Sequence, residues 1–161
     1  MNNPIYVLSI DPGKTTGIVL ASCKSPKDFT VISAKDWKWS SRFEIPEYYN
    51  LDNPLGLMYS LSNFNGQIPT YVVIESFNLF RHKAQQLTGS DFPAVRVIGM
   101  IEYAMSEAGI LDRLITQTPS QRIRAKILDQ HVQDLKGLHH AKDAYKHLRV
   151  FISNPMNKVF E

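Results

Sequence analysis

The chain has 161 residues, and its 18 Lys and Arg residues against 15 Asp and Glu residues give a net charge of +3. This length suits a single domain over residues 1–161, and a hydrophobic fraction of 43% is ordinary for a globular protein. The sequence has no apolar run near the ~20 residues that cross a bilayer and no signal-peptide pattern, so we expect a cytoplasmic protein without a membrane partner. The mild positive charge permits a polyanionic partner without requiring one.

Cys23 is the single cysteine, so it has no partner for an internal disulfide. This count fits a reducing compartment. The surrounding stretch ASCKSPKD predicts a turn, and a lone cysteine without a paired base is rarely catalytic. We therefore expect no catalytic role for Cys23.

The N-terminal part of the chain predicts an antiparallel meander of three strands. The strands are expected at three short apolar runs, residues 6–10, 17–21 and 29–34. Residues 36–50 have no clean period and predict a long connection. Residues 54–65 carry apolar side chains at helical spacing and are followed by Gly66, which predicts a helix that ends there.

The rest of the chain alternates predicted strands and helices. Strands are expected at residues 70–75 and 113–117, and helices at 93–108, from Thr118 onward and at 139–152. Residues 76–92 predict a polar, aromatic loop, and the tail from Ser153 predicts a peripheral segment. The order predicts an α/β fold with a mixed five-stranded sheet flanked by helices.

The stretch VLSIDPGKTTGIVL resembles the end of a phosphate-binding loop at Gly13-Lys14-Thr15. Such a loop needs a glycine five residues before Gly13, where this chain has Leu8, and it must lead into a helix. The sequence after Thr15 instead predicts a strand, so Pro12, Gly13 and Gly17 are interpreted as turning the chain. An Asp and a Gly-containing turn between strands also occur in actin-like and sugar-kinase folds, which need two lobes.

Three acidic residues occupy positions that suit a shared site. Asp11 ends the first strand, Glu75 ends the fourth, and Asp143 lies early in the last helix. His140 precedes Asp143 by three residues and therefore shares its helix face. If the first and fourth strands are neighbours, these groups meet at one sheet edge. Taken singly, each residue also has an ordinary role in a turn, at a solvated strand end or in helix capping.

Divalent cations relieve the repulsion and desolvation that such carboxylates suffer together. Mg²⁺ prefers hard oxygen ligands, and two ions about 4 Å apart can activate water for an in-line displacement. The pattern therefore favours phosphodiester hydrolysis.

Three segments in order resemble the RuvC group of Holliday-junction resolvases within the RNase H-like nucleases. They are LSIDPGKTTGIVL, YVVIESF and HHAKDAYKHLRVFI. RHKAQQLTGSDFPAVRVIGMIEYA is similar to the family's loop and following helix, and ITQTPSQRIRAKIL stands where the family has a strand and a basic helix. The resemblance spans residues 4–152 and implies an RNase H-like fold.

The resemblance also implies an endonuclease that cleaves branched DNA with Mg²⁺ or Mn²⁺, two ions per site, usually as a homodimer. Asp11, Glu75, His140 and Asp143 would be both the catalytic residues and the metal ligands, with Asp11 shared by the two ions. His140 stands where some members have Asp; it either favours Mn²⁺ as a softer ligand or moves a proton to or from water. His139 is a rival, but its spacing to Asp143 is four residues.

The candidate DNA-binding residues lie in the loops and helix that we expect to flank this site. Phe77 and Phe80 straddle the position of the family's aromatic wedge, and either could instead pack beneath the loop. The candidate phosphate contacts are Lys14, Arg81, Lys83, Arg122, Arg124 and Lys126.

Some features leave alternatives open. The segment Trp37–Tyr49 has no counterpart in the family and is either core or an added DNA or partner surface. The helix over residues 93–108 is either a dimer interface or a core helix. A less selective nuclease acting on flaps, Y-forms or RNA–DNA hybrids fits the same residues, as does a non-catalytic DNA-binding module.

Overall fold

The computed structural model describes residues 3–38, 69–77, 92–118, 135–157 and 159–160. Its strands are β1 (Ile5–Asp11), β2 (Thr15–Cys23), β3 (Phe29–Lys38), β4 (Tyr71–Glu75) and β5 (Leu114–Gln117). Its helices are α3 (Pro93–Glu107) and α5 (His139–Ser153), with 3₁₀ turns at Leu111–Arg113 and Pro155–Asn157. No helix among these residues is long and apolar enough to cross a membrane.

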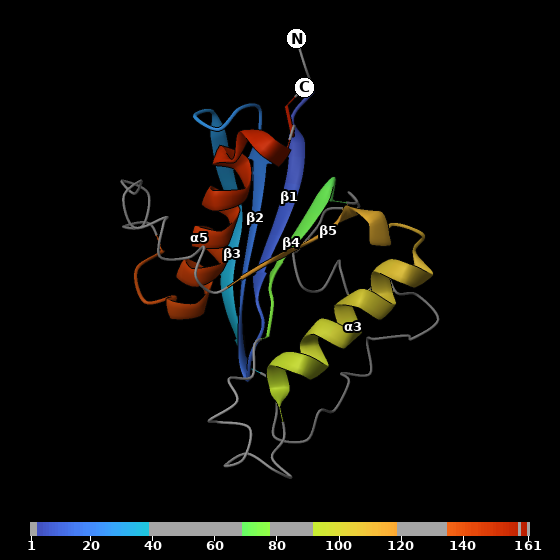
Figure 1. Ribbon diagram of the computed structural model, residues 1–161. Coiled ribbons are helices and arrows are strands. Elements are labelled where there is room, and N and C mark those ends of the chain that lie inside the picture. The colour runs from blue at the N-terminus through green and yellow to red at the C-terminus, as the bar shows by residue number, and fades with distance from the viewer. Residues whose placement is uncertain (1–2, 39–68, 78–91, 119–134, 158, 161) are drawn as a thin grey trace.

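The five strands form one mixed sheet in the order β3-β2-β1-β4-β5 (Figure 1). β1, β2 and β3 are antiparallel neighbours, which confirms the predicted meander. β4 runs parallel to both β1 and β5, so the first and fourth strands are neighbours, as expected. The carboxyl ends of β1, β4 and β5 therefore lie at the same edge of the sheet.

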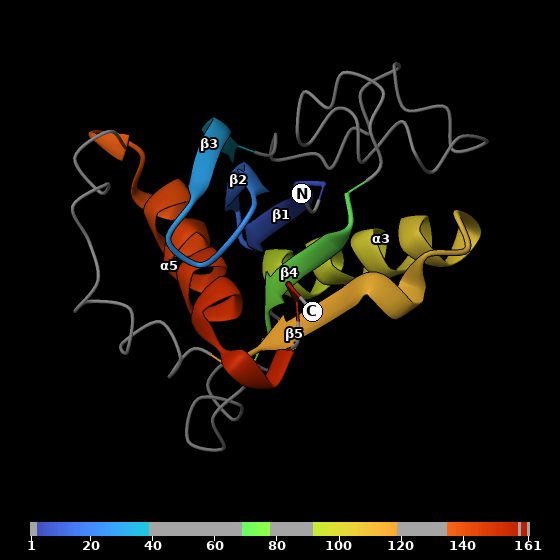
Figure 2. The same ribbon diagram turned by 90° about the horizontal axis from the view of Figure 1, so that it is seen from above.

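Side chains that alternate along each strand divide between two cores, one on each face of the sheet. Leu8 and Ile10 of β1 lie in the core that includes Ile101 of α3. Val7 lies in the opposite core, which includes Leu148 of α5. Figure 2 shows α5 covering one face of the sheet and α3 the other. The odd-numbered side chains of β1 thus face α5.

The helix α3 begins where its sequence predicts and ends one residue earlier than predicted, at Glu107. Pro93 is its first residue, where a missing N–H costs nothing. Gly109 follows its end with φ 67°, a conformation that a glycine adopts without strain. The N–H groups of Gly109 and Ile110 donate to the carbonyls of Ser106 (3.0 Å) and Met105 (2.9 Å), which is a Schellman motif.

Two details of the prediction are wrong. β3 continues to Lys38, so residues 36–38 belong to the sheet and not to a connection. Cys23 is the last residue of β2, and its side chain is fully buried in the core beneath α5 instead of lying in a turn. Burial raises the pKa of its thiol to about 12, which agrees with the expectation that Cys23 is not a nucleophile.

The tail of the chain is also less peripheral than predicted, because Val159 and Phe160 pack against the core beneath α5. Two further predictions fall outside the described residues: the helix over residues 54–65 and the helix that follows Thr118. These two remain predictions.

Candidate active site

Asp11 ends β1 on the face of the sheet that α5 covers. It shares this face with Val7 and Ser9, because side chains two residues apart point the same way from a strand. Its strand partner across the antiparallel pair is Gly17. Asp11 is only 9% exposed, so its carboxyl group is almost entirely removed from water.

Glu75 and Gln117 reach the same place from the two neighbouring strands. Ile10 pairs with Ile74, so the residues that follow them, Asp11 and Glu75, lie beside each other at the strand ends. Glu75 pairs in turn with Gln117 of β5. Three adjacent strands therefore end in polar side chains at one sheet edge.

The helix α5 brings further polar groups over this edge. His140, Asp143 and His147 are spaced by three and four residues and therefore share one helix face. The hydroxyl of Ser9 donates to the carbonyl of Ala144 at 2.7 Å, which fastens β1 to the middle of the helix. The face that bears the two histidines is thus held against the strand ends.

His140 and Asp11 are in direct contact, with Nδ1 of the ring 3.1 Å from Oδ2 of the carboxyl group. Burial raises the pKa of Asp11 from 3.8 to about 6; the hydrogen bond from His140 opposes the rise, and the charges of Glu75 and Asp143 add to it. The other three groups named as catalytic candidates from the sequence thus all act on Asp11. His139 is exposed on the same helix, and the short contact to Asp11 belongs to His140.

A second pair joins Glu75 to His147, a residue that was not singled out from the sequence. Oε2 of Glu75 lies 2.7 Å from Nε2 of His147, and Nδ1 of the same ring lies 2.8 Å from Oε1 of Gln117. His147 is completely buried. Its position seven residues after His140 was a usable signal, because that spacing returns to the same helix face.

Asp143 makes a third pair, with Lys146 one turn later on α5. The lysine Nζ lies 2.7 Å from Oδ1, and both side chains are about a quarter exposed. Each of the three carboxylates therefore has a basic partner in this structure. The sequence predicted the carboxylates but not this pairing.

The start of α5 is set in place by two residues of the meander. Asp36 of β3 accepts hydrogen bonds from the backbone N–H groups of Ala141 (2.7 Å) and His140 (3.4 Å), and thereby supplies the side-chain cap that the N-cap residue Leu138 does not provide. A Cβ atom on Gly17 would come within 2.0 Å of the His140 backbone. Gly17 is therefore a close-approach residue within β2 and not, as interpreted from the sequence, part of the turn.

Among the described residues, no three His, Cys, Asp or Glu side chains converge closely enough to hold a metal ion. The donors nevertheless suit one in kind, because carboxylate oxygens and an imidazole are ligands of Mg²⁺ and Mn²⁺. The negative charges of Glu75 and Asp143 both raise the pKa of Asp11, so a cation beside Asp11 would be favoured.

Two of the proposed DNA contacts are described. Lys14 is exposed in the turn between β1 and β2, and Phe77 is 39% exposed two residues after Glu75, with its ring centroid 5.5 Å from that of Phe92. The other candidates lie outside the described residues: Phe80, Arg81, Lys83, Arg122, Arg124 and Lys126.

The burial of side chains bears on two alternatives that the sequence left open, the role of the segment that begins at Trp37 and the role of the helix α3. Trp37 packs against the core beneath α3, which supports the core interpretation for this residue, while residues 39–49 lie outside the described ranges. α3 buries Val97 and Ile101, so it is a core helix, and it exposes Val95 and Tyr103 on its other side. A dimer interface formed by these exposed side chains of α3 stays a prediction.

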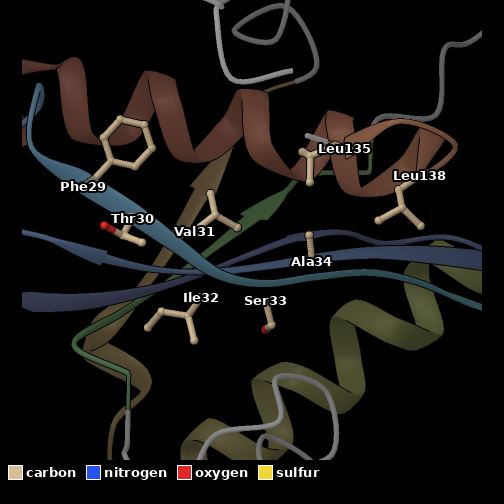
Figure 3. A pocket seen from close by; sticks show the side chains of 8 residues that line it. All are labelled: Phe29, Thr30, Val31, Ile32, Ser33, Ala34, Leu135 and Leu138. Carbon is tan, nitrogen blue, oxygen red and sulfur yellow. The ribbon is translucent and has the colours of Figure 1, made fainter. Parts of the chain in front are cut away.

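A cavity of about 490 Å³ lies beside β3, away from the carboxylates. Residues 29–34, Leu135 and Leu138 line it. Figure 3 shows Val31, Ala34, Leu135 and Leu138 on the side of β3 that faces α5, whereas Ile32 and Ser33 point to the other side of the strand. None of these described lining residues is an acid, a histidine or a lysine, so they offer no groups for acid–base or metal chemistry.

No family model and no curated protein sequence matches the chain. Solved structures do. The structure of Thermus thermophilus RuvC in complex with a Holliday junction substrate has a TM-score of 0.61 and 18% identity, with 97% of each chain covered. Another T. thermophilus RuvC structure has a TM-score of 0.58 and 19% identity over 91% of this chain and 93% of that one.

The yeast mitochondrial Holliday junction resolvase Ydc2 is similar as well, with a TM-score of 0.58, 14% identity, and coverage of 94% of this chain and 79% of that one. At these identities the similarity establishes the fold. The chain has the mixed five-stranded sheet and flanking helices of the RNase H-like fold found in RuvC.

Proposed function

We propose that the protein is a metal-dependent endonuclease that hydrolyses DNA phosphodiesters in four-way junctions and related branched DNA. The observation that carries this proposal is that Asp11 and Glu75 end neighbouring strands beneath α5, whose His140 contacts Asp11 and whose Asp143 shares the helix face of His140. A cluster of carboxylates costs folding energy, so it is retained where chemistry needs it. The similar fold of RuvC bound to a Holliday junction substrate supports DNA as the ligand.

The proposed cofactor is Mg²⁺ or Mn²⁺, two ions per site, held by Asp11, Glu75, His140 and Asp143. Such ions activate a water molecule and stabilise the leaving oxygen of a phosphodiester. Asp11 is the central ligand in this proposal, because both other carboxylates act on its charge. Above pH 6 Asp11 is largely ionised and ready to bind a cation.

His140 has two possible uses beside Asp11. Its side chain is 44% exposed while Nδ1 contacts the nearly buried carboxyl group, so the ring connects that group with solvent. An imidazole in this place can donate a proton to Oδ2 of Asp11 or take one from water near neutral pH. The same nitrogen is also able to serve as a ligand once the contact to Asp11 is exchanged.

Lys14 and Phe77 flank the carboxylates and are proposed to meet the DNA. The exposed ammonium group of Lys14 would neutralise a phosphate, and the half-exposed ring of Phe77 would stack on a base at the branch. Phe80, Arg81, Lys83, Arg122, Arg124 and Lys126 are proposed to extend this surface. A homodimer would cut two strands of one junction symmetrically.

The test is cleavage of a labelled four-way junction with Mg²⁺, Mn²⁺ or chelator. We expect cleavage with either metal and none with chelator. Asp11→Asn, Glu75→Gln and Asp143→Asn should each reduce cleavage at least ~100-fold, since several kcal/mol of charge stabilisation are lost, while junction binding persists. Full activity in any of the three variants would sink the assignment.

Substrate comparison separates the alternatives. Equal cleavage of flaps, Y-forms or RNA–DNA hybrids would indicate a less selective nuclease. Binding of the junction without cleavage by either metal, and with an affinity that chelator does not change, would indicate a non-catalytic DNA-binding module.

A further inference from the structure

His147 is an unusual side chain for the middle of the α5 core. It is completely buried, and its helix neighbours in that core are Ala144 and Leu148. A buried polar group without partners costs about 1–3 kcal/mol, so an apolar residue would be the simpler choice here. His147 instead meets polar side chains with both ring nitrogens. Those side chains, Glu75 and Gln117, are the ends of β4 and β5.

The direction of the contact to Glu75 follows from donor chemistry. An ionised carboxylate only accepts hydrogen bonds, so Nε2 of His147 donates to Oε2. The Gln117 side chain can serve Nδ1 in either protonation state. Its oxygen accepts from a doubly protonated ring, and its amide N–H, after a half-turn, donates to a neutral one. In both arrangements Nε2 donates to Glu75.

The three carboxylates of the site differ in how firmly their partners hold them. Lys146, the partner of Asp143, is 24% exposed and has a flexible side chain. His140, the partner of Asp11, is 44% exposed. His147 is 0% exposed, has only two rotatable side-chain bonds, and is fixed by Gln117 on its far side. Glu75 is therefore the carboxylate whose orientation is set from within the core.

We propose that His147 is a positioning residue: by donating to Oε2 it orients the Glu75 carboxylate so that its remaining lone pairs face the cation site, with Gln117 fixing the ring. This inference rests on the proposed function in taking Glu75 as a metal ligand. Hydrogen-bond partners behind a ligand commonly contribute 10- to 100-fold in metal affinity, on the order expected here.

A pair of substitutions isolates the contact. In His147→Gln the side-chain amide reaches the place of Nε2 and can still donate to Glu75, whereas in His147→Asn it reaches only the place of Nδ1. The measurement is Mn²⁺ binding to the full chain by titration calorimetry without DNA. We expect the Asn variant to bind Mn²⁺ about 10-fold more weakly or worse, and the Gln variant to remain within about 3-fold of wild type.

The controls use residues of the same chain. His139→Asn and His139→Gln make the same substitutions at an exposed position of α5 and should leave Mn²⁺ affinity unchanged. Glu75→Gln identifies the heat signal of the proposed site, which it should abolish. Thermal unfolding measures the stability of each variant. If His147 had only a structural role, both substitutions would lower the stability, and the two variants would have the same Mn²⁺ affinity.

Equal Mn²⁺ affinity in the folded Asn variant and wild type would overturn the inference, and so would a Mn²⁺ signal that Glu75→Gln leaves intact or a wild type that binds no Mn²⁺. If both His147 variants fail to fold, Gln117→Ala removes the far support of the ring, and unchanged Mn²⁺ affinity there overturns the inference as well. A wild type that binds Mn²⁺ as expected but cleaves no junction contradicts the proposed nuclease instead.

Discussion

The two ends of the polar face of α5 are built differently. At its first turn, Asp11 contacts a half-exposed His140, and in the next turn Asp143 contacts the partly exposed Lys146. Two turns after His140, Glu75 contacts a fully buried His147 that Gln117 holds from behind. One site therefore combines partners that are accessible to solvent or a ligand with a partner that is buried and held on both sides.

The first turn of α5, which carries the exposed His140, is held in place by contacts of its backbone. The helix begins over Gly17, and Asp36 caps it from the neighbouring strand. Gly17 and Asp36 are partners in the pairing of β2 with β3. The position of His140 is therefore fixed by the meander, and changes in the meander should affect the exposed end of α5 before the buried end.

Gly17→Ala should have the largest effect on the exposed end of α5 and on the stability of the protein. The new methyl group would lie within 2.0 Å of His140 backbone atoms, so the first turn of α5 must shift. We expect a loss of about 3 kcal/mol or more in the free energy of unfolding, at the upper end of overpacking effects. Urea unfolding measures it.

Gly99→Ala is the matched control, because a methyl group there meets no atom within 4 Å on an exposed part of α3. It should stabilise the protein by up to about 1 kcal/mol, the helix-propensity gain of Ala over Gly. If Gly17→Ala is tolerated equally well, α5 does not depend on the close approach to β2.

Asp11→Asn should stabilise the protein while abolishing cleavage. The raised pKa means that the folded state binds the Asp11 proton more tightly than the unfolded state does. The stabilising contribution of this proton is complete below pH 4 and is lost as the pH rises through about 6. Asn does not titrate, so the variant should gain up to about 3 kcal/mol above pH 7, reduced by the weakened contact to His140, and nothing below pH 4.

Urea unfolding of wild type and Asp11→Asn at several pH values, with chelator, measures this gain. A difference between the two proteins that is the same at pH 4 and pH 8 would contradict the pKa assignment for Asp11.

The sequence predicted the parts of this site that depend on local periodicity. Strand ends at Asp11 and Glu75 follow from apolar runs that stop there, and the spacing of His140 and Asp143 places them on one helix face. The parallel neighbourhood of the first and fourth strands was an assumption that the sheet order confirms.

The missing parts depend on contacts between distant residues. Asp36 caps α5 across about a hundred positions of the chain, a relation that exists only once β3 is paired with β2 in the right register. His147 shares a helix face with His140, but a single histidine among apolar neighbours most often belongs to the core. The role of Gly17 could not be predicted either, because the reason for the glycine is its close approach to a helix that begins more than 120 residues later.

Asp36→Ala should weaken the exposed end by an intermediate amount. The backbone N–H groups of His140 and Ala141 would lose their acceptor, which typically costs about 0.5–2 kcal/mol at a helix start. Asp36→Asn keeps one acceptor oxygen and should cost less. Urea unfolding gives the stability, and cleavage should fall further in the Ala variant than in the Asn variant, because His140 loses its fixed backbone. Equal stability of both variants and wild type would show that the first turn of α5 holds without this cap.

Lys146→Ala should have the smallest effect on stability and is the sharpest contrast to His147. The pair with Asp143 is partly exposed and spaced i,i+3, so its loss should change the free energy of unfolding by less than about 0.5 kcal/mol. The ammonium group binds Oδ1 of Asp143 and would compete there with the proposed cation, so its removal should leave Mn²⁺ affinity equal or tighter. Removal of Lys146, which would compete with the metal, and removal of the His147 hydrogen bond, which would orient a ligand, should therefore change Mn²⁺ affinity in opposite directions. A tenfold loss of Mn²⁺ affinity in Lys146→Ala would mean that the exposed pair also orients its carboxylate, and the division of the site into two kinds of support would fail.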